Sequence, residues 1–100
     1  MRIIRKTGVF GKWLDGLKDI RARARILVRI QRLEGGNAGD AKPVGSGVSE
    51  MRIDYGPGHR VYFCKQGREI VILLAGGTKG TQSTDIKRAI HLSENLEKPS

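Results

Sequence analysis

Cysteine, aromatic residues and acidic residues are all scarce in this sequence of 100 residues. The single cysteine, Cys64, excludes an intramolecular disulfide and a metal cluster built from cysteines, and it fits a reducing compartment. No apolar run approaches the ~20 residues of a membrane-spanning helix, and no apolar stretch follows the basic N-terminus as it would in a signal peptide. We therefore expect a cytoplasmic protein that has no membrane partner.

The scarcity of acidic residues leaves a strong positive charge. The chain has 19 Lys and Arg residues against 10 Asp and Glu residues, which gives a net charge of +9 and a pI of about 10.3. Residues 1–33 contain ten of the basic residues and only two acidic ones. This balance predicts a polyanionic or acidic partner, whereas a solvated basic surface that keeps a small protein soluble is the plainer alternative.

The length predicts one domain over residues 1–100 with one modest core. Residues 2–6 fit a short edge strand. Thr7 is a suitable N-cap for a first amphipathic helix that ends near residue 16, and Asp19 is a suitable N-cap for a second helix over residues 19–33. The short link between the two helices predicts an antiparallel helical hairpin.

The second helix is predicted to have two unlike faces. At 100° per residue, its Ile, Leu and Ala side chains fall on one broad face. The opposite face carries a stripe of arginines, namely Arg21, Arg25, Arg29 and Arg32. This stripe is either a solvated surface or a contact surface for RNA or for an acidic protein.

Strands and a last helix follow a loop-rich segment. Residues 35–47 are rich in glycine and leave room for a short strand at 42–44. Alternating apolar residues, separated by turn signals, then predict strands over 48–55, 59–65 and 69–75 and a helix over 81–97. The order of the elements predicts an α+β fold, in which helices pack on a mainly antiparallel sheet of four to five strands.

Hydrophobic alternation predicts how the first two of these strands pair. A three-residue connection at 56–58 places Ile53 opposite Val61 and Arg52 opposite Tyr62, which keeps the apolar side chains on one face. The other face would then display a basic and aromatic patch made of Arg52, Asp54, Arg60 and Tyr62. A surface ion pair between Asp54 and Arg60 is the plainer interpretation of this patch.

The strand at 69–75 is apolar on both faces. A two-residue turn at Gln66 and Gly67 would place Ile72 and its alternate neighbours on the core face, and Val71 and Leu73 on the patch face. We therefore expect the patch face to be partly covered, either by the last helix or by a partner chain.

Four stretches of the chain resemble the RelE/HigB-type addiction-module killer proteins. The resemblance covers about residues 7–93 and is carried by WLDGLKD, ARILVRIQRLEGGNAGD, KPVGSGVSEMRIDYGPGHRVYF and IVILLAGGTKGTQSTDIKRA. It implies a RelE/ParE-like fold, with a helical hairpin against a mainly antiparallel sheet and a C-terminal helix. Two positions depart from the family pattern, since His59 stands where Tyr is usual and Thr78 where Asp is usual.

The resemblance also implies partners. These are a helix-turn-helix antitoxin, the ribosome with its messenger RNA, and operator DNA reached only through the complex with the antitoxin. The favoured function is therefore the toxin of a type II toxin–antitoxin system that cleaves messenger RNA on the ribosome. A ParE-like inhibitor of DNA gyrase, a non-enzymatic nucleic-acid-binding protein and an inactive relative remain open.

Cleavage of RNA without a metal uses the substrate's own 2′-hydroxyl as the nucleophile, so the protein must bind and neutralise the phosphate. Arg60 and Arg52 suit this task because a guanidinium binds phosphate with two parallel hydrogen bonds. Lys79 follows a buried strand in a glycine-rich segment, where a functional contact is favoured. These three are the candidate catalytic residues, and the candidate substrate-binding residues are His59, Tyr62, Gln82, Arg25 and Arg29. No residue stands out as the general base, and we expect neither a cofactor nor a metal site.

Overall fold

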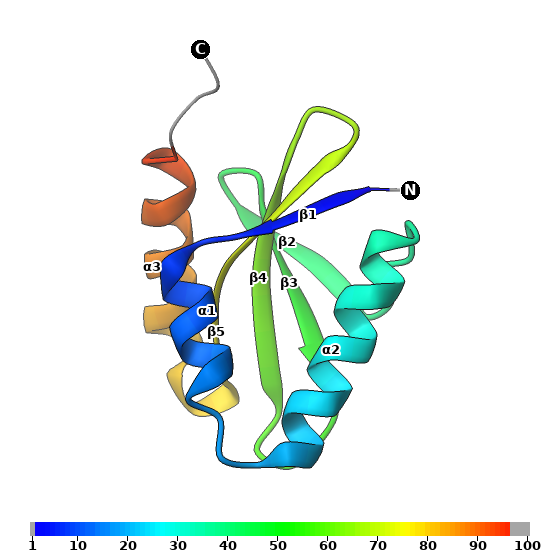
Figure 1. Ribbon diagram of the computed structural model, residues 1–100. Coiled ribbons are helices and arrows are strands. Elements are labelled where there is room, and N and C mark those ends of the chain that lie inside the picture. The colour runs from blue at the N-terminus through cyan, green and yellow to red at the C-terminus, as the bar shows by residue number, and fades with distance from the viewer. Residues whose placement is uncertain (1, 97–100) are drawn as a thin grey trace.

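The computed structural model describes residues 2–96 (Figure 1). Its elements in chain order are β1 (Ile3–Lys6), α1 (Gly8–Asp15), α2 (Ile20–Glu34), β2 (Ala41–Gly45), β3 (Val48–Ile53), β4 (His59–Gln66), β5 (Ile70–Thr78), the short 3-10 helix η1 (Lys79–Thr81) and α3 (Gln82–Glu94). The strands form one five-stranded sheet in the order β1-β5-β4-β3-β2, with β1 parallel to β5 and the other neighbours antiparallel. The predicted α+β class is confirmed. The last helix ends before its predicted end at residue 97, which lies outside the described residues.

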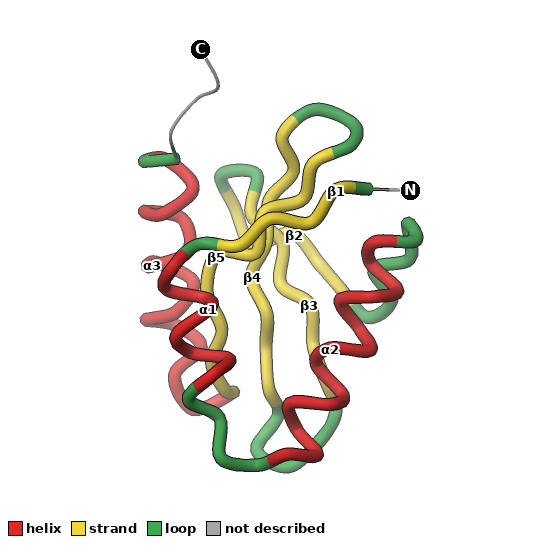
Figure 2. The backbone as a smooth tube through the Cα atoms, in the orientation of Figure 1, coloured by secondary structure: helices red, strands yellow, loops and turns green. Residues whose placement is uncertain are grey.

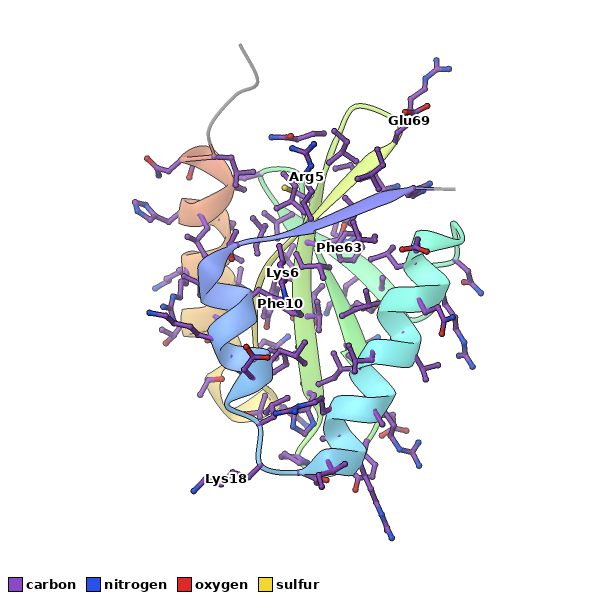
Figure 3. All side chains as sticks on the ribbon, in the orientation of Figure 1. Arg5, Lys6, Phe10, Lys18, Phe63 and Glu69 are labelled. Atoms are coloured by element: carbon purple, nitrogen blue, oxygen red, sulfur yellow. The ribbon has the colours of Figure 1, made fainter. Side chains whose placement is uncertain are left out.

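Helices cover both faces of the sheet (Figures 1 and 2). One apolar cluster, which includes Phe10 and Phe63, packs α1 and α2 against one face. A second cluster around Leu74 lies under α3 on the other face. α1 and α2 run in opposite directions, as predicted, but α1 lies over β5 and α2 over β3 and β4. In Figure 3 the side chains of Lys18 and Glu69 project from opposite ends of the molecule.

Both predicted N-caps of the first two helices are confirmed. The Thr7 hydroxyl accepts a hydrogen bond from the Phe10 amide at 3.1 Å and donates one to the Leu74 carbonyl at 2.6 Å, so it also ties α1 to β5. Asp19 accepts hydrogen bonds from the amides of Arg21 and Ala22 in the first turn of α2, at 3.0 and 3.2 Å. None of the helices within residues 2–96 combines the length and the apolar character needed to cross a bilayer.

The predicted register between β3 and β4 is wrong by two residues. The connection spans residues 54–58 instead of 56–58, so Ile53 pairs with His59 and Arg52 pairs with Arg60. The longer connection closes on itself, because the Gly58 amide donates to the carbonyl of Tyr55 at 3.2 Å. Since the shift is even, the two faces of each strand stay as predicted.

The predicted register between β4 and β5 is also wrong, and here the faces exchange. The connection has three residues, 67–69, so that Gln66 pairs with Ile70. This odd shift turns Val71 and Leu73 toward α1 and α2, and Ile72 toward α3. The predicted patch is divided, because Tyr62 is buried under α3 and Arg60 is largely enclosed, whereas Arg52 and Asp54 stay accessible. The alternative that the last helix supplies the cover is confirmed.

Candidate functional site

Strand ends meet at one end of the sheet and form a shallow pocket of about 330 Å³. β3 ends there, β4 begins there, and β5 passes into η1. The pocket is lined by Asp40, Arg52, Ile53, Asp54, Gly58, His59, Arg60 and Lys79. The structure thus brings the three candidate catalytic residues and one candidate substrate-binding residue around one pocket.

Gly58 is hydrogen-bonded to two of the cationic residues of the pocket. Its carbonyl accepts hydrogen bonds from Nη1 of Arg60 at 3.0 Å and from the backbone amide of Lys79 at 2.9 Å. Gly58 has a φ of +78°, and a Cβ at this position would come within 3.4 Å of Arg60 Nη1. A glycine is therefore favoured here, both by the backbone conformation and by the close approach of the arginine.

Arg60 is the most enclosed cation of the pocket. Its side chain is only 10% exposed, and its Nε lies 3.5 Å from Oε1 of the fully buried Glu50. The second carboxylate oxygen of Glu50 accepts a hydrogen bond from Gln82 at 2.8 Å. Gln82 therefore contacts Glu50 beneath the pocket and is absent from the residues that line the pocket.

Tyr62 is fully buried on the same side of β4 as Arg60, among residues that pack against α3. Burial, and after it the negative charge of Glu50, raise the pKa of the Tyr62 phenol. The phenol is therefore a neutral group at physiological pH. It lies under α3, outside the pocket, so its ring is not placed to stack on an RNA base in this structure.

Arg52 is held much more loosely than Arg60. Its Nη2 lies 3.0 Å from Oδ1 of Asp40, and the two side chains are 43% and 56% exposed. An ion pair this open to water contributes only about 0–1 kcal/mol. A phosphate can therefore replace Asp40 as the partner of Arg52 at little cost.

His59 lines the pocket but is 5% exposed. Its Nδ1 lies 3.3 Å from the carbonyl oxygen of Tyr55, and its ring centroid is 6.4 Å from that of Trp13. These contacts place the ring in the wall of the pocket instead of on an exposed stacking surface.

Lys79 is exposed at the rim of the pocket. Within residues 2–96 no ion pair engages its ammonium group. Its backbone is fixed by the hydrogen bond to Gly58, so an exposed cationic side chain is anchored at a defined position. With Arg52 and Arg60, the pocket therefore offers two guanidinium groups and one ammonium group, which suit a phosphate. Among the described residues, no group of His, Cys, Asp and Glu is placed to hold a metal ion.

The arginines of α2 lie beside this pocket and line a groove of about 450 Å³ together with Ile53 and Asp54. Arg25 stacks over the ring of Tyr55, with its Cζ 4.7 Å from the ring centroid. Arg29 instead donates to the backbone carbonyls of Arg52 and Ala38. Burial lowers the pKa of Arg29, an effect that nearby Asp40 partly offsets. These contacts fix α2 against the end of β3.

Two carboxylates of the site were not predicted from the sequence. Asp40 pairs with Arg52, and Glu50 pairs with Arg60. By strand alternation Glu50 shares a face with Arg52, which the sequence alone predicts to be the outer face. The signal that points to its burial is the strand 69–75, which is apolar on both faces and therefore requires cover over the face that carries Glu50.

Comparison with known proteins covers nearly the whole chain. Residues 12–97 match the family described as phage-derived protein Gp49-like (DUF891). An uncharacterized protein of Haemophilus influenzae (strain ATCC 51907 / DSM 11121 / KW20 / Rd) is 50% identical over 93 residues, which make up 93% of this chain and 94% of the relative. All residues that line the pocket lie within the match to the family.

Proposed function

The chain belongs to the Gp49-like family, a toxin-like family of addiction modules, and on that premise we propose that it is a toxin that cleaves messenger RNA on the ribosome. A cognate antitoxin with a helix-turn-helix neutralises it in this proposal. The resemblance to the RelE/HigB-type proteins supports the choice of RNA. The observation that carries the proposal is the meeting of Arg52, Arg60 and Lys79 around one pocket.

The proposed reaction needs neither a metal nor a cofactor. The 2′-oxygen of a nucleotide attacks the adjacent phosphorus, the bond from phosphorus to the 5′-oxygen of the next nucleotide breaks, and a 2′,3′-cyclic phosphate forms. One proton leaves the 2′-hydroxyl and one is added to the departing 5′-oxygen. The protein stabilises the extra negative charge that develops on the phosphate oxygens.

Arg60 and Arg52 bind the non-bridging phosphate oxygens in this mechanism, from the two paired strands β4 and β3. Lys79, whose backbone amide donates to the same Gly58 carbonyl as Arg60, neutralises the charge on the departing oxygen. His59 is our candidate for proton transfer. When its Nδ1 carries the proton that faces the Tyr55 carbonyl, Nε2 is free of a proton and can accept one.

The first test uses Lys79, because its exposed side chain can be removed without disturbing the fold. We expect induced expression of the wild-type chain in a bacterial host to arrest growth and to create new 5′ ends within translated codons, detected by primer extension. Lys79→Ala should lose both effects, whereas Lys87→Ala, which removes an exposed lysine from the outer side of α3, should retain them.

Two results would reject the proposal. Growth arrest with intact messenger RNA and trapped gyrase–DNA complexes would identify a gyrase inhibitor on this fold. Normal growth, with salt-sensitive RNA binding by the purified chain, would identify a non-enzymatic binding protein.

A further inference from the structure

We propose that Glu50 is a positioning residue, whose buried carboxylate holds the Arg60 guanidinium in the wall of the pocket and so sets how a phosphate is bound. This inference rests on the proposed nuclease function of the pocket. It also gives Gln82 a role different from substrate contact, because Gln82 holds Glu50.

The burial of Glu50 calls for a reason. Its side chain is completely inaccessible to solvent on β3, where it lies opposite Tyr62. A buried carboxylate is costly unless it is paired. Even a paired buried ion is often no more stabilising than apolar residues of similar size. Stability alone therefore does not account for a charged pair at this position.

The geometry around Arg60 supplies the reason. The Nε side of the guanidinium faces Oε1 of Glu50 at 3.5 Å, and Nη1 donates to the carbonyl of Gly58 at 3.0 Å. The ion pair with Glu50, which lacks hydrogen-bond geometry, attracts one side of the guanidinium, and the hydrogen bond to Gly58 restrains the other side. A guanidinium has five N–H donors, so the donors that remain are available to a phosphate in the pocket that Arg60 lines.

Glu50 is itself restrained from the opposite side. Gln82, the first residue of α3, donates to Oε2 of Glu50 at 2.8 Å. A chain of contacts thus runs from α3 through Gln82 and Glu50 to Arg60. Because Glu50 is fully buried and faces Arg60, it does not reach the substrate and acts only through the arginine.

The test is a double-mutant cycle of Glu50 and Arg60. The quantity measured is the cleavage of ribosome-bound messenger RNA. Glu50→Gln keeps the size of the side chain and its ability to contact Gln82, but it removes the charge that faces Arg60. We expect kcat/KM to fall by about tenfold or more in the wild-type background, with rates corrected for the folded fraction measured by urea unfolding. In an Arg60→Lys background, whose ammonium has no fixed plane, the same change should cost less than about threefold.

Gln82→Ala is the second variant, since it keeps both charges and alters only the half-buried first residue of α3. It should also lower kcat/KM in the wild-type background and have no effect in the Arg60→Lys background. An equal loss in both backgrounds, or no loss in either, would overturn the positioning role. If the wild-type chain leaves messenger RNA intact, the proposed function fails instead, and the next measurement decides on Glu50 alone.

That measurement is the NMR signal of the Arg60 Nε–H group, identified by its disappearance in Arg60→Lys. The wild-type signal should be sharp and protected from exchange with water, and Glu50→Gln should broaden it and speed its exchange. An unchanged signal in a folded Glu50→Gln variant would overturn the inference whether or not the protein cleaves RNA.

Discussion

Arg52 and Arg60 lie directly opposite each other on β3 and β4, and each has a carboxylate of its own. Like charges in such a cross-strand pair destabilise a sheet unless they are compensated. Asp40 compensates Arg52 at the surface, whereas Glu50 compensates Arg60 in the interior. Arg60 therefore depends on its carboxylate partner much more than Arg52 does, although the two arginines are directly paired.

The first prediction concerns stability at these paired positions. Arg60→Met should lower the free energy of unfolding by about 3–5 kcal/mol, because it leaves the buried Glu50 carboxylate without a counter-charge. Arg52→Met should change it by less than about 1 kcal/mol, because the ion pair with Asp40 is open to water. Urea unfolding followed by circular dichroism gives both values.

The double variant Glu50→Gln with Arg60→Met removes both buried charges. It should recover most of the stability lost in Arg60→Met. A double variant that is less stable than Arg60→Met would show that the buried charge is not the cause of the loss.

Local signals in the sequence were sufficient for the helices but not for the strand register. Thr7 and Asp19 cap the helices that follow them, because a cap depends on amides only two or three residues away. The pairing of Arg52 with Arg60 depends on how residues 54–58 turn, and several turn lengths satisfy the same alternation of apolar residues. Local sequence therefore determined the helix caps but left the pairing register of the strands undetermined.

The site could also be predicted only in part from the sequence. Arg52, Arg60 and Lys79 were chosen from their charge, their place in the chain and the resemblance to a known family, and they do line one pocket. The inward position of Gln82 could not be read from the sequence, because it depends on how α3 crosses the sheet after η1. The contact of Gln82 with Glu50 links residues separated by 32 positions in the chain.

The second prediction concerns the glycine that lets α3 approach the sheet. A Cβ on Gly77 would overlap the carboxylate of Asp85, which also accepts a hydrogen bond from the Thr81 hydroxyl. Gly77→Ala should therefore lower the free energy of unfolding by about 1–3 kcal/mol. Gly80→Ala is the matched control, because the nearest atom to its new Cβ is Thr78 Oγ1 at 3.7 Å. If thermal unfolding finds the two variants equally stable, the Asp85 side chain moves aside at little cost and the predicted loss is wrong.

The third prediction concerns alkaline pH. Burial and the charge of Glu50 raise the pKa of Tyr62 above its ordinary value of 10.0, and burial also raises the pKa of the Cys64 thiol. The unfolded chain therefore loses these protons at a lower pH than the native protein. Their contribution to stability is complete below the ordinary pKa values and is lost as the pH rises above them.

Tyr62→Phe tests this pH dependence. Above pH 10 the wild-type protein should lose about 1.4 kcal/mol of unfolding free energy per pH unit more than Tyr62→Phe does. Urea midpoints measured from about pH 8 to about pH 11 give the difference. Tyr55→Phe, on the opposite side of the sheet, removes a phenol at another position and serves as the control. A parallel decline of wild type and Tyr62→Phe would contradict the pKa shift.

The fourth prediction follows from the weak hold of Asp40 on Arg52. In the proposed function, a phosphate has to displace the Asp40 carboxylate, which lies 3.0 Å from Arg52 Nη2. Asp40→Asn keeps the shape of the side chain but removes its charge. Because an exposed pair of this kind is worth about 0.2–1 kcal/mol, the variant should bind a single-stranded RNA about 1.5 to 5 times more tightly. Fluorescence anisotropy at several salt concentrations measures the change.

Removing any negative charge from a basic protein strengthens RNA binding slightly, so the position must be tested apart from the charge. Asp15→Asn makes the same change of charge at the exposed end of α1, at a residue that does not line the pocket. If the pocket binds the phosphate, Asp40→Asn should gain more affinity than Asp15→Asn. The gain should also vanish when Arg52 is replaced by Met, because the released guanidinium is then missing. An equal gain from both variants would instead assign the effect to net charge, and RNA would then bind without using Arg52.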